Sequence, residues 1–467
     1  MNTNVGRNTP RVAVIGGGIA GLTAAYELRK QLGPDARILI VEAYDRLGGK
    51  LKTVNFSTGP VDMGAEAYLG FRQDFTALLE ELGLGDALRT PSGLPSGLFV
   101  EGALVDAPKD TVMGIPASGD AVRQVLGEQA AQRIDAERTG EAMTWTPGQD
   151  TTVGQLVEAR LGRAVVDQLV SPMLGGVYSC SADDLSVRAT VPQVAAELDR
   201  WGEKNSPFYL VDVIDAILDK RRQAPASGPV FRSIDGGYAA VVDALIDAAK
   251  PEILYNAGVE SLSRTSRGWY VEPIGEFDAA VVATPAPTAG VLVKDVAPVA
   301  SDALASVELA SSVVVGMRLA SDHGIPQRSG VLLGEHAPTE AKAFTFSSRK
   351  WPHLNVEGGS IVRASFGTLQ QPWYLEADDR ALLSYAVDDL EKVTGERKQP
   401  QEFFVQRWWG GLPCYGVGHM ERMGQALNDV EGVAGLALAG AAYQGVGVPA
   451  TAQSGVAAAR KIVQDLS

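Results

Sequence analysis

The regular pattern of the chain begins with a short, wholly apolar run that leads into glycines. Residues 12–15 are Val-Ala-Val-Ile, and such a run is typical of a strand buried on both faces of a parallel sheet. Residues 22–30 then place apolar side chains at helical spacing, and a second apolar run ends at Glu42. This order of strand, glycine turn, helix and strand predicts a doubly wound α/β fold.

The middle of the chain changes to helical periodicity. Residues 121–222 are predicted to be mostly helical, with a glycine-containing segment, 171–178, between helices. Residues 225–229 contain two prolines and are predicted to form a linker. The helices are expected over residues 122–134, 153–161, 164–170, 191–202 and 209–222.

The last part of the chain returns to apolar runs of strand length. Residues 279–283 and 435–440 are expected to form buried parallel strands, and residues 451–466 a closing helix. Residues 307–319 and 360–366 indicate a second, more antiparallel sheet. The parallel sheet is therefore assembled from separated segments, and the insertions between them would supply the walls of a substrate site.

These patterns divide the chain into three predicted domains. Its 467 residues are enough for two or three domains with large cores. A discontinuous nucleotide-binding domain is expected from residues 1–89, 225–295 and 400–467. Residues 90–224 are predicted to form a mostly helical domain and residues 296–399 a mixed-sheet domain.

The glycine turn has the spacing of a dinucleotide-binding loop. Its glycines permit a tight turn, close approach of a pyrophosphate, and contact between helix and strand. Glu42 lies 21 residues beyond Gly21, where a carboxylate would bind a ribose hydroxyl and repel a 2′-phosphate. A bare structural turn and a solvated strand-end acid are the alternatives. The loop consists of Gly16, Gly17, Gly18, Ile19, Ala20 and Gly21.

Two more glycine-containing segments could bind the same ligand. Arg46 and Lys50 flank a double glycine, which would place a cation beside a pyrophosphate; a charged surface turn is the alternative. Residues 440–449 hold three glycines between a predicted strand and helix. A second helix N-terminus at this loop would favour negative charge in a reduced flavin ring. Together with the first loop, this segment predicts FAD.

Composition and charge exclude several classes of partner. The 41 basic and 56 acidic residues give a net charge of −15, which disfavours nucleic acid and anionic lipid. Cys180 and Cys414 form no CxxC motif and the four histidines are scattered, so neither a disulfide scaffold nor a metal centre is expected. Residues 1–10 lack a signal-peptide core, and the uncharged segment 432–459 is too interrupted to span a membrane. We expect a cytoplasmic protein.

Other conspicuous residues have ordinary structural explanations. Trp408 and Trp409 are typical of core packing, His419 of a hydrogen-bonded structural residue, and Cys414 of an inert thiol. The sequence contains no Ser-His-Asp arrangement and no convincing acid–base pair. No catalytic side chain is therefore assigned.

Taken together, these segments resemble the flavin-dependent porphyrinogen oxidases of the amine-oxidase-like flavoprotein superfamily. The first two motifs occur throughout the superfamily, whereas the middle and last ones are more specific. They extend over nearly the whole chain. The motifs are GGGIAGL (16–22), VEAYDRLGGK (41–50), DMGAEAYLGFR (62–72), SPMLGGVYSCSADDLSVRATVP (171–192), SIDGGYAAVVDAL (233–245), RWWGGLPCYGVGH (407–419) and GAAYQGVGVPATAQSG (440–455).

The resemblance implies noncovalent FAD in a p-hydroxybenzoate-hydroxylase-like fold, with a sheet-rich substrate domain and a helical domain. It implies that residues 16–21 hold the pyrophosphate, Glu42 and Ala43 the ribose region, and Lys50 a phosphate or ribose. The other implied cofactor contacts are Gly64, Ala65, Glu66 and Ala67 near the flavin, Val259 at the adenine, Trp408 beside the cofactor, and Val446, Gly447 and Val448 at the ring.

The resemblance also implies oxidation of a porphyrinogen by dioxygen, with release of hydrogen peroxide, in heme biosynthesis. Soluble Gram-positive members oxidise coproporphyrinogen III, whose four propionates require cations. The candidates are Arg72, which aligns with a basic family position, and Arg188, Arg200 and Arg407; an ordinary surface arginine is the alternative for each. Gly176 lies in the segment expected to line the substrate pocket. A downstream ferrochelatase and a peripheral membrane contact stay open as partners.

Three other functions are considered. Oxidation of protoporphyrinogen IX is the nearest alternative within the family. An amine oxidase would carry a lysine in the strand near the flavin, and residues 313–318 contain none. A non-enzymatic binding protein, like the prenylation escort proteins, can lose the glycine pattern, which is intact here at both ends.

Overall fold

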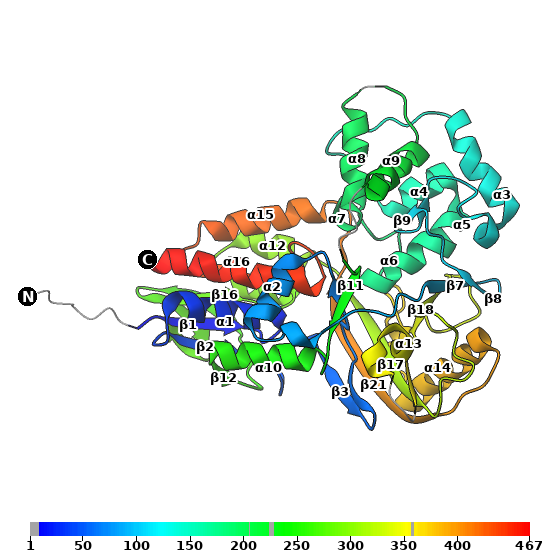
Figure 1. Ribbon diagram of the computed structural model, residues 1–467. Helices are drawn as coiled ribbons and strands as arrows, with labels where there is room; N and C mark the ends of the chain where they lie inside the picture. Colours follow the sequence, from blue (N-terminus) through cyan, green and yellow to red (C-terminus); the bar gives the residue numbers. More distant parts are fainter. Residues whose placement is uncertain (1–8, 205, 224–227, 356–358) are drawn as a thin grey trace, which may run out of the picture.

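The computed structural model describes residues 9–204, 206–223, 228–355 and 359–467. Segment 1–8, for which no signal peptide is predicted, lies outside these residues, as do residues 225–227 of the predicted linker. Figure 1 shows three regions: a parallel sheet with its helices, a helical region, and a second large sheet. The first region meets the other two along one side.

A five-stranded parallel sheet forms the first region, in the order β12-β2-β1-β16-β22. Its strands β1 and β16 pair in register from Val12 with Ala279 to Ile15 with Val282, and these side chains are buried. This sheet confirms the predicted doubly wound α/β fold. The strands are β1 (Arg11–Ile15), β2 (Arg37–Val41), β12 (Glu252–Leu254), β16 (Ala279–Val282) and β22 (Leu436–Leu438).

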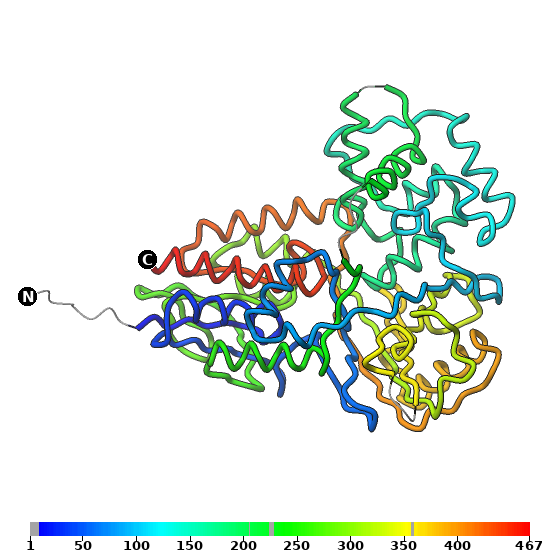
Figure 2. Tube along the Cα trace, viewed as in Figure 1, coloured from blue at the N-terminus to red at the C-terminus, as the bar shows by residue number. Residues whose placement is uncertain are grey.

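Helices cover both faces of this sheet. One face shares an apolar core with α1 (Ile19–Leu32), α10 (Tyr238–Ala249) and α16 (Val448–Leu466). Figure 2 shows the last helix of the chain lying beside the first, and a Cβ atom on Gly455 would lie 2.1 Å from the Ala20 carbonyl oxygen. The other face packs against α11 (Ala286–Val293), α12 (Pro298–Ala305), α15 (His419–Glu431) and the small sheet of β13 (Ser261–Thr265), β14 (Gly268–Glu272) and β15 (Gly275–Phe277).

Short elements lead from the parallel sheet toward the other two regions. Strand β11 pairs with both β5 and β6, so segments far apart in the sequence meet there. The elements are β3 (Thr53–Phe56), β4 (Gly59–Asp62), β5 (Tyr68–Leu69), α2 (Gln73–Glu81), β6 (Leu88–Arg89) and β11 (Phe231–Ile234).

A seven-stranded sheet, in the order β21-β17-β20-β19-β18-β7-β8, forms the second large layer. All neighbours are antiparallel except β18 and β7. Residues 96–106 and 400–413 lie outside the predicted mixed-sheet domain, yet they belong to this sheet, because β7 pairs with β18 and β21 pairs with β17. The domain limits stay a prediction. The strands are β7 (Ser96–Val100), β8 (Ala103–Asp106), β17 (Leu309–Leu319), β18 (Gly330–Leu333), β19 (Ala343–Thr345), β20 (Ser360–Phe366) and β21 (Pro400–Pro413).

The two faces of the seven-stranded sheet differ in burial. One face, with Val315, Phe344 and Phe366, is buried in a core that includes α14 (Asp379–Thr394). On the other face, Ile361 and Arg363 are buried, whereas Thr345, Ser365, Gln406 and Trp408 are half-buried. The helix α13 (Ser347–Lys350) lies beside this sheet. The second face is therefore available to line a cavity.

The helical region, as far as the structure describes it, contains two helices outside the predicted ranges, the short α7 (Val187–Thr190) and α6 (Ser171–Tyr178). Residues 171–178, expected between helices, form helix α6, because Leu174 and Tyr178 are buried in the core of this region while Pro172 occupies the first turn. In the described part of the chain, no helix is long and apolar enough to cross a membrane. The elements are β9 (Thr111–Val112), β10 (Ile115–Pro116), α3 (Arg123–Asp135), α4 (Val153–Leu161), α5 (Arg163–Val165), α6 (Ser171–Tyr178), α7 (Val187–Thr190), α8 (Pro192–Gly202) and α9 (Leu210–Gln223).

Candidate cofactor and substrate site

The N-terminal glycine loop joins β1 to α1, and neighbouring backbone atoms leave no room for side chains at two of its glycines. Gly16 has a φ of +107°, and a Cβ atom there would lie 2.6 Å from the Ala283 carbonyl oxygen. A Cβ atom on Gly21 would lie 1.9 Å from the Gly16 carbonyl oxygen. Beside Gly18, in contrast, the nearest heavy atom would be the Gly49 Cα at 4.0 Å. The loop therefore leaves open space at Gly18, where a phosphate could approach the backbone.

Glu42 holds this loop against the end of β2. Its Oε2 accepts a hydrogen bond of 2.7 Å from the Gly17 N–H, and its Oε1 accepts one of 3.0 Å from the Tyr44 N–H. Each carboxylate oxygen has a further lone pair, so a ribose hydroxyl could still donate to it. The neighbouring Ala43 is exposed. The position of Glu42 thus fits the predicted ribose contact.

Lys50 and Arg46, although close in sequence, lie in different surroundings. The Arg46 guanidinium donates to the carbonyl oxygens of Leu47, Gly49 and Leu51, so it fixes the turn rather than facing a ligand. Lys50 has no hydrogen bond or ion pair among residues 9–204, 206–223, 228–355 and 359–467.

The Lys50 side chain is accessible, yet desolvation by the surrounding protein lowers its pKa. A desolvated cation without an anionic partner among the described residues fits a phosphate ligand. Lys50 and the open space at Gly18 therefore fit a dinucleotide.

Gly64 brings the Lys50 turn and the second large sheet together. A Cβ atom on Gly64 would lie 2.1 Å from the Lys50 carbonyl oxygen and 3.1 Å from the Trp408 ring. The Trp408 Nε1–H donates to the Met63 carbonyl oxygen at 3.0 Å. Three of the predicted cofactor residues thus form one contiguous wall, and Trp408 is part of that wall rather than of a buried core.

Glu66 is held by two cations that the sequence analysis did not identify. Arg363 on β20 pairs with its carboxylate at 2.6 Å and also donates to the Asp62 carbonyl oxygen, and Lys350 pairs with the other carboxylate oxygen. Burial alone would raise the pKa of Glu66, but Arg363 and Lys350 lower it to about 2. The Glu66 side chain therefore ties the segment between β4 and β5 to β20 and α13. The segment Gly64–Ala67 can then reach a cofactor with its backbone and with Ala65 and Ala67.

Arg363 was visible in the sequence as the charged residue inside the apolar run 360–366. A buried arginine in such a run requires an anionic partner. Its partner could not be found from the sequence, because Glu66 lies on a separate segment near the start of the chain.

The C-terminal glycine loop is held by side chains of the segment that follows β21. The Tyr415 hydroxyl donates to the Ala441 carbonyl oxygen at 2.5 Å and accepts from the Gly445 N–H at 3.0 Å. The His419 Nε2 donates to the Ala442 carbonyl oxygen at 2.6 Å, and burial lowers its pKa. The predicted structural role of His419 is thereby explained: it positions the loop.

Val446, Gly447 and Val448 lead directly from this loop into α16. Helix α16 has Gly447 as its N-cap and starts at Val448, three residues earlier than predicted. Because α1 and α16 pack closely, the N-termini of the two helices lie near each other. Val259 precedes β13 and is half-buried, and the nearby Ala257 N–H donates to the Glu42 carbonyl oxygen at 3.0 Å. Val259 therefore lies in the segment beside the predicted ribose contact.

The arginines proposed to bind propionates are all engaged with carboxylates. Arg72 forms two hydrogen bonds to Asp74, of 2.9 and 2.6 Å. The other three pairs are Arg188 with Asp199, Arg200 with Glu197, and Arg407 with Asp379. Their charge is already balanced within the protein, which weakens each of them as a substrate ligand.

Gly176 occupies a different kind of position. It is exposed on α6, and a Cβ atom there would lie 3.6 Å from the Leu332 side chain of β18. Gly176 therefore lies between the helical region and the seven-stranded sheet, as a pocket-lining residue would.

Comparison with known proteins identifies close relatives over the whole chain. The chain is 38% identical over 98% of its length to a protein from Mycobacterium bovis named coproporphyrinogen III oxidase, which is itself covered to 98%. A Staphylococcus aureus protein of the same name is 26% identical over 98% of this chain and 100% of its own. A crystal structure of a protoporphyrinogen oxidase-like protein from Exiguobacterium sp. 255-15 superimposes with a TM-score of 0.85 at 28% identity, covering 98% of this chain and 100% of that one.

A family model described as flavin containing amine oxidoreductase matches residues 19–463. This match confirms the predicted flavoprotein fold, the FAD cofactor and the oxidoreductase class. The chain, which holds the two glycine loops described above, belongs to the flavin-containing amine oxidoreductase family.

Proposed function

We propose that this protein oxidises coproporphyrinogen III to coproporphyrin III, with noncovalently bound FAD as cofactor and dioxygen as oxidant. The observation that carries the proposal is the 38% identity, over 98% of both chains, to a protein named coproporphyrinogen III oxidase. Lys50, which has no ion pair within the described part of the chain, and the open space at Gly18 support it, because both features fit the phosphates of a dinucleotide.

Bound FAD would supply a two-electron acceptor for a hydride from the reduced macrocycle. Three two-electron oxidations convert the porphyrinogen to the porphyrin, so three molecules of dioxygen are reduced to three of hydrogen peroxide. The protein's own task is to orient the macrocycle and exclude side reactions. We assign no side chain as proton acceptor; the backbone carbonyl of Gly176 is the candidate on α6.

In this proposal different residues of the candidate site contact different parts of the cofactor. Residues 16–21 hold the pyrophosphate, Glu42 with Ala43 the ribose, and Lys50 a phosphate. The N-terminus of α16, at Val446–Val448, stabilises negative charge on the reduced ring. The remaining contacts are Gly64, Ala65, Glu66 and Ala67 near the flavin, Trp408 beside the cofactor and Val259 at the adenine.

The substrate would lie between α6 and the half-buried face of the seven-stranded sheet. Gly176 marks this space, and apolar and polar side chains line it from the sheet. Such a mixture suits a macrocycle that is apolar in its ring and anionic at its edge. Arg72 stays a proposed substrate contact, and it would have to exchange Asp74 for the ligand.

The test compares coproporphyrinogen III with protoporphyrinogen IX as substrates. Protoporphyrinogen IX is the second candidate, because a chloroplastic or mitochondrial protoporphyrinogen oxidase from Arabidopsis matches part of the chain. Porphyrin fluorescence and peroxide would be followed together. We expect a higher kcat/KM for coproporphyrinogen III and one peroxide for each two electrons. A preference for protoporphyrinogen IX would overturn the choice of substrate.

A second measurement examines the cofactor. The purified protein should be yellow, and denaturation should release all of the FAD into solution. Colour that stays with the denatured chain would contradict noncovalent binding. We also propose that the protein is cytoplasmic and that a ferrochelatase is the next protein to receive the product. Co-purification with a ferrochelatase would test the second of these proposals.

A further inference from the structure

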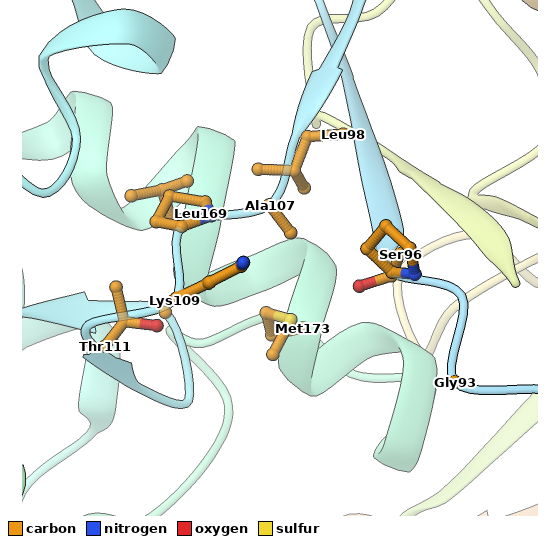
Figure 3. Close-up of a pocket in the computed structure, with 11 residues that line it drawn as sticks. Gly93, Ser96, Leu98, Ala107, Lys109, Thr111, Leu169 and Met173 are labelled. Atoms are coloured by element: carbon orange, nitrogen blue, oxygen red, sulfur yellow. The ribbon is translucent and has the colours of Figure 1, made fainter. Parts of the chain in front are cut away.

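A cavity of about 440 Å³ lies between the seven-stranded sheet and helix α6, and none of the cofactor residues lines it. This volume is within the range of small-molecule pockets, about 300–1,000 Å³. Figure 3 shows side chains from β7, the connection between β8 and β9, and the helical region converging on it. Its principal lining residues are Ser96, Leu98, Lys109, Thr111, Leu169 and Met173.

The cavity is lined by helix α6, which also holds Gly176, and by β7, which pairs with the strand of Leu332. Met173 and Gly176 are three residues apart on α6, so they share one face of the helix. On the sheet side, Leu98 pairs in register with Leu332, and Leu332 contacts the position of Gly176. The same helix face and the same sheet face therefore line both the cavity and the proposed substrate site.

Lys109 is the cation that enters this cavity. Figure 3 shows its ammonium group extending into the space between Leu169 and Met173. In contrast to the four arginines considered above, it has no ion pair or hydrogen bond within the described ranges of the chain. The neighbouring acids are engaged elsewhere, Asp106 with Arg328 and Asp110 with Arg222. Lys109 is thus free to bind an anion from a ligand.

An apolar pocket with one unpaired cation fits a ligand that is apolar in its ring and carries a carboxylate at its edge. We propose that Lys109 binds one of the two propionates that coproporphyrinogen carries and protoporphyrinogen lacks, and so selects the tetracarboxylate over the dicarboxylate. This inference rests on the proposed function, and it adds a specificity-determining residue to it.

Steady-state kinetics of Lys109→Met test the inference, because methionine keeps the apolar stem and removes the charge. We expect KM for coproporphyrinogen III to rise about tenfold with kcat within twofold, and KM for protoporphyrinogen IX to stay within twofold. Lys109→Arg should restore most of the affinity. Lys294→Met, at an exposed lysine after α11, is the matched control and should leave both substrates unchanged. An unchanged ratio of the two kcat/KM values in Lys109→Met would overturn the inference.

Equilibrium binding separates this inference from the proposed function. Coproporphyrin III and protoporphyrin IX can be titrated against the FAD-loaded protein by fluorescence. Lys109→Met should weaken coproporphyrin III about tenfold and protoporphyrin IX by less than twofold. If the wild-type protein oxidises neither porphyrinogen, the proposed function fails, and the titration still decides the inference. Equal effects of the substitution on both porphyrins would show that Lys109 does not select between them.

Discussion

The two glycine-rich loops, one at each end of the chain, lie close together in the fold but are shaped by different forces. In the N-terminal loop, Gly16 and Gly21 are required because a Cβ atom on either would collide with backbone. In the C-terminal loop, Gly440 and Gly445 have φ values of +144° and +133°, but an added Cβ atom would be 3.6 and 3.2 Å from its nearest neighbour and would not collide with backbone. Tyr415 and His419 hold that loop by hydrogen bonds from a distant segment. Collision with backbone is therefore a feature of the N-terminal loop alone among these glycines.

This difference has a consequence for what substitutions do. Steric requirements are local and severe, because backbone atoms at either side of the loop cannot move without breaking the sheet. A hydrogen bond from a distant side chain contributes less, and its loss loosens the loop while the strands stay paired. A side chain at Gly16 or Gly21 should therefore cost the most stability, whereas loss of the Tyr415 hydroxyl should cost less and weaken cofactor binding.

Gly21→Ala should have the largest effect. Its Cβ would lie 1.9 Å from the Gly16 carbonyl oxygen, so α1 must move away from β1. We expect the free energy of unfolding to fall by about 3 kcal/mol or more, measured by urea denaturation. Gly424→Ala in α15 is the control, because no atom lies within 4 Å of its added Cβ, and it should stabilise the protein by about 0.5–1 kcal/mol. Equal stability of the two variants would contradict the steric explanation.

Tyr415→Phe should have the next largest effect, and it acts on the other loop. Removal of the hydroxyl leaves the Ala441 carbonyl and the Gly445 N–H without their partner. We expect a loss of about 2 kcal/mol in stability and faster release of FAD, followed by the recovery of flavin fluorescence. Tyr385→Phe, at an exposed tyrosine of α14, should change neither quantity. A Tyr415→Phe protein that retains FAD like the wild type would show that the loop does not depend on this side chain.

The same distinction explains what the sequence could predict. Residues 12–15, 279–283 and 435–440 reveal their strands because an uninterrupted apolar run has few other uses. The glycine spacing of 16–21 is equally local. In contrast, the ion pairs of Glu66 join residues that are 284 or more positions apart, and no local pattern indicates them.

The prediction for residues 171–178, which form helix α6, was wrong for a related reason. Its Gly175 and Gly176 favour a loop by local propensity, whereas the burial of Leu174 and Tyr178 in a tertiary core stabilises a helix. The acidic partners of the arginines chosen as propionate ligands could not be seen in the sequence either, so those arginines stay predictions that the ion pairs weaken. Lys109 could be recognised only once the structure showed which cations lack a partner.

Gly18→Ala tests whether the open space in the N-terminal loop is meant for a ligand. Gly18 has a φ of −73°, which alanine adopts readily, and an added Cβ would be 4.0 Å from the nearest atom. We expect the stability of the FAD-free protein to change by less than about 0.5 kcal/mol.

FAD affinity, in contrast, should fall at least about tenfold, or about 1.4 kcal/mol, in a titration of the FAD-free Gly18→Ala protein. Gly18→Ala would thus weaken ligand binding without unfolding the protein, whereas Gly21→Ala in the same loop would destabilise the fold. Unchanged FAD affinity would remove Gly18 from the proposed pyrophosphate site.

The smallest effect is a pH dependence confined to the C-terminal loop. Burial lowers the pKa of His419 in the folded protein, whereas in the unfolded chain it is close to 6.5. Above pH 6.5 both states are neutral at this residue, and its contribution to stability is complete. As the pH falls below 6.5, the unfolded chain binds a proton that the folded protein excludes, so stability is lost at up to about 1.4 kcal/mol per pH unit.

His419→Gln keeps an N–H donor near the Ala442 carbonyl oxygen and does not titrate in this range. The difference in unfolding free energy between the wild type and His419→Gln should therefore be nearly constant from pH 8 to 7 and shrink as the pH falls below 6.5. Groups that titrate in both proteins cancel in this difference. If the stability curves of the two proteins ran parallel over the whole pH range, the folded protein would accept a charged His419. The C-terminal loop would then be less rigid than its hydrogen bonds indicate.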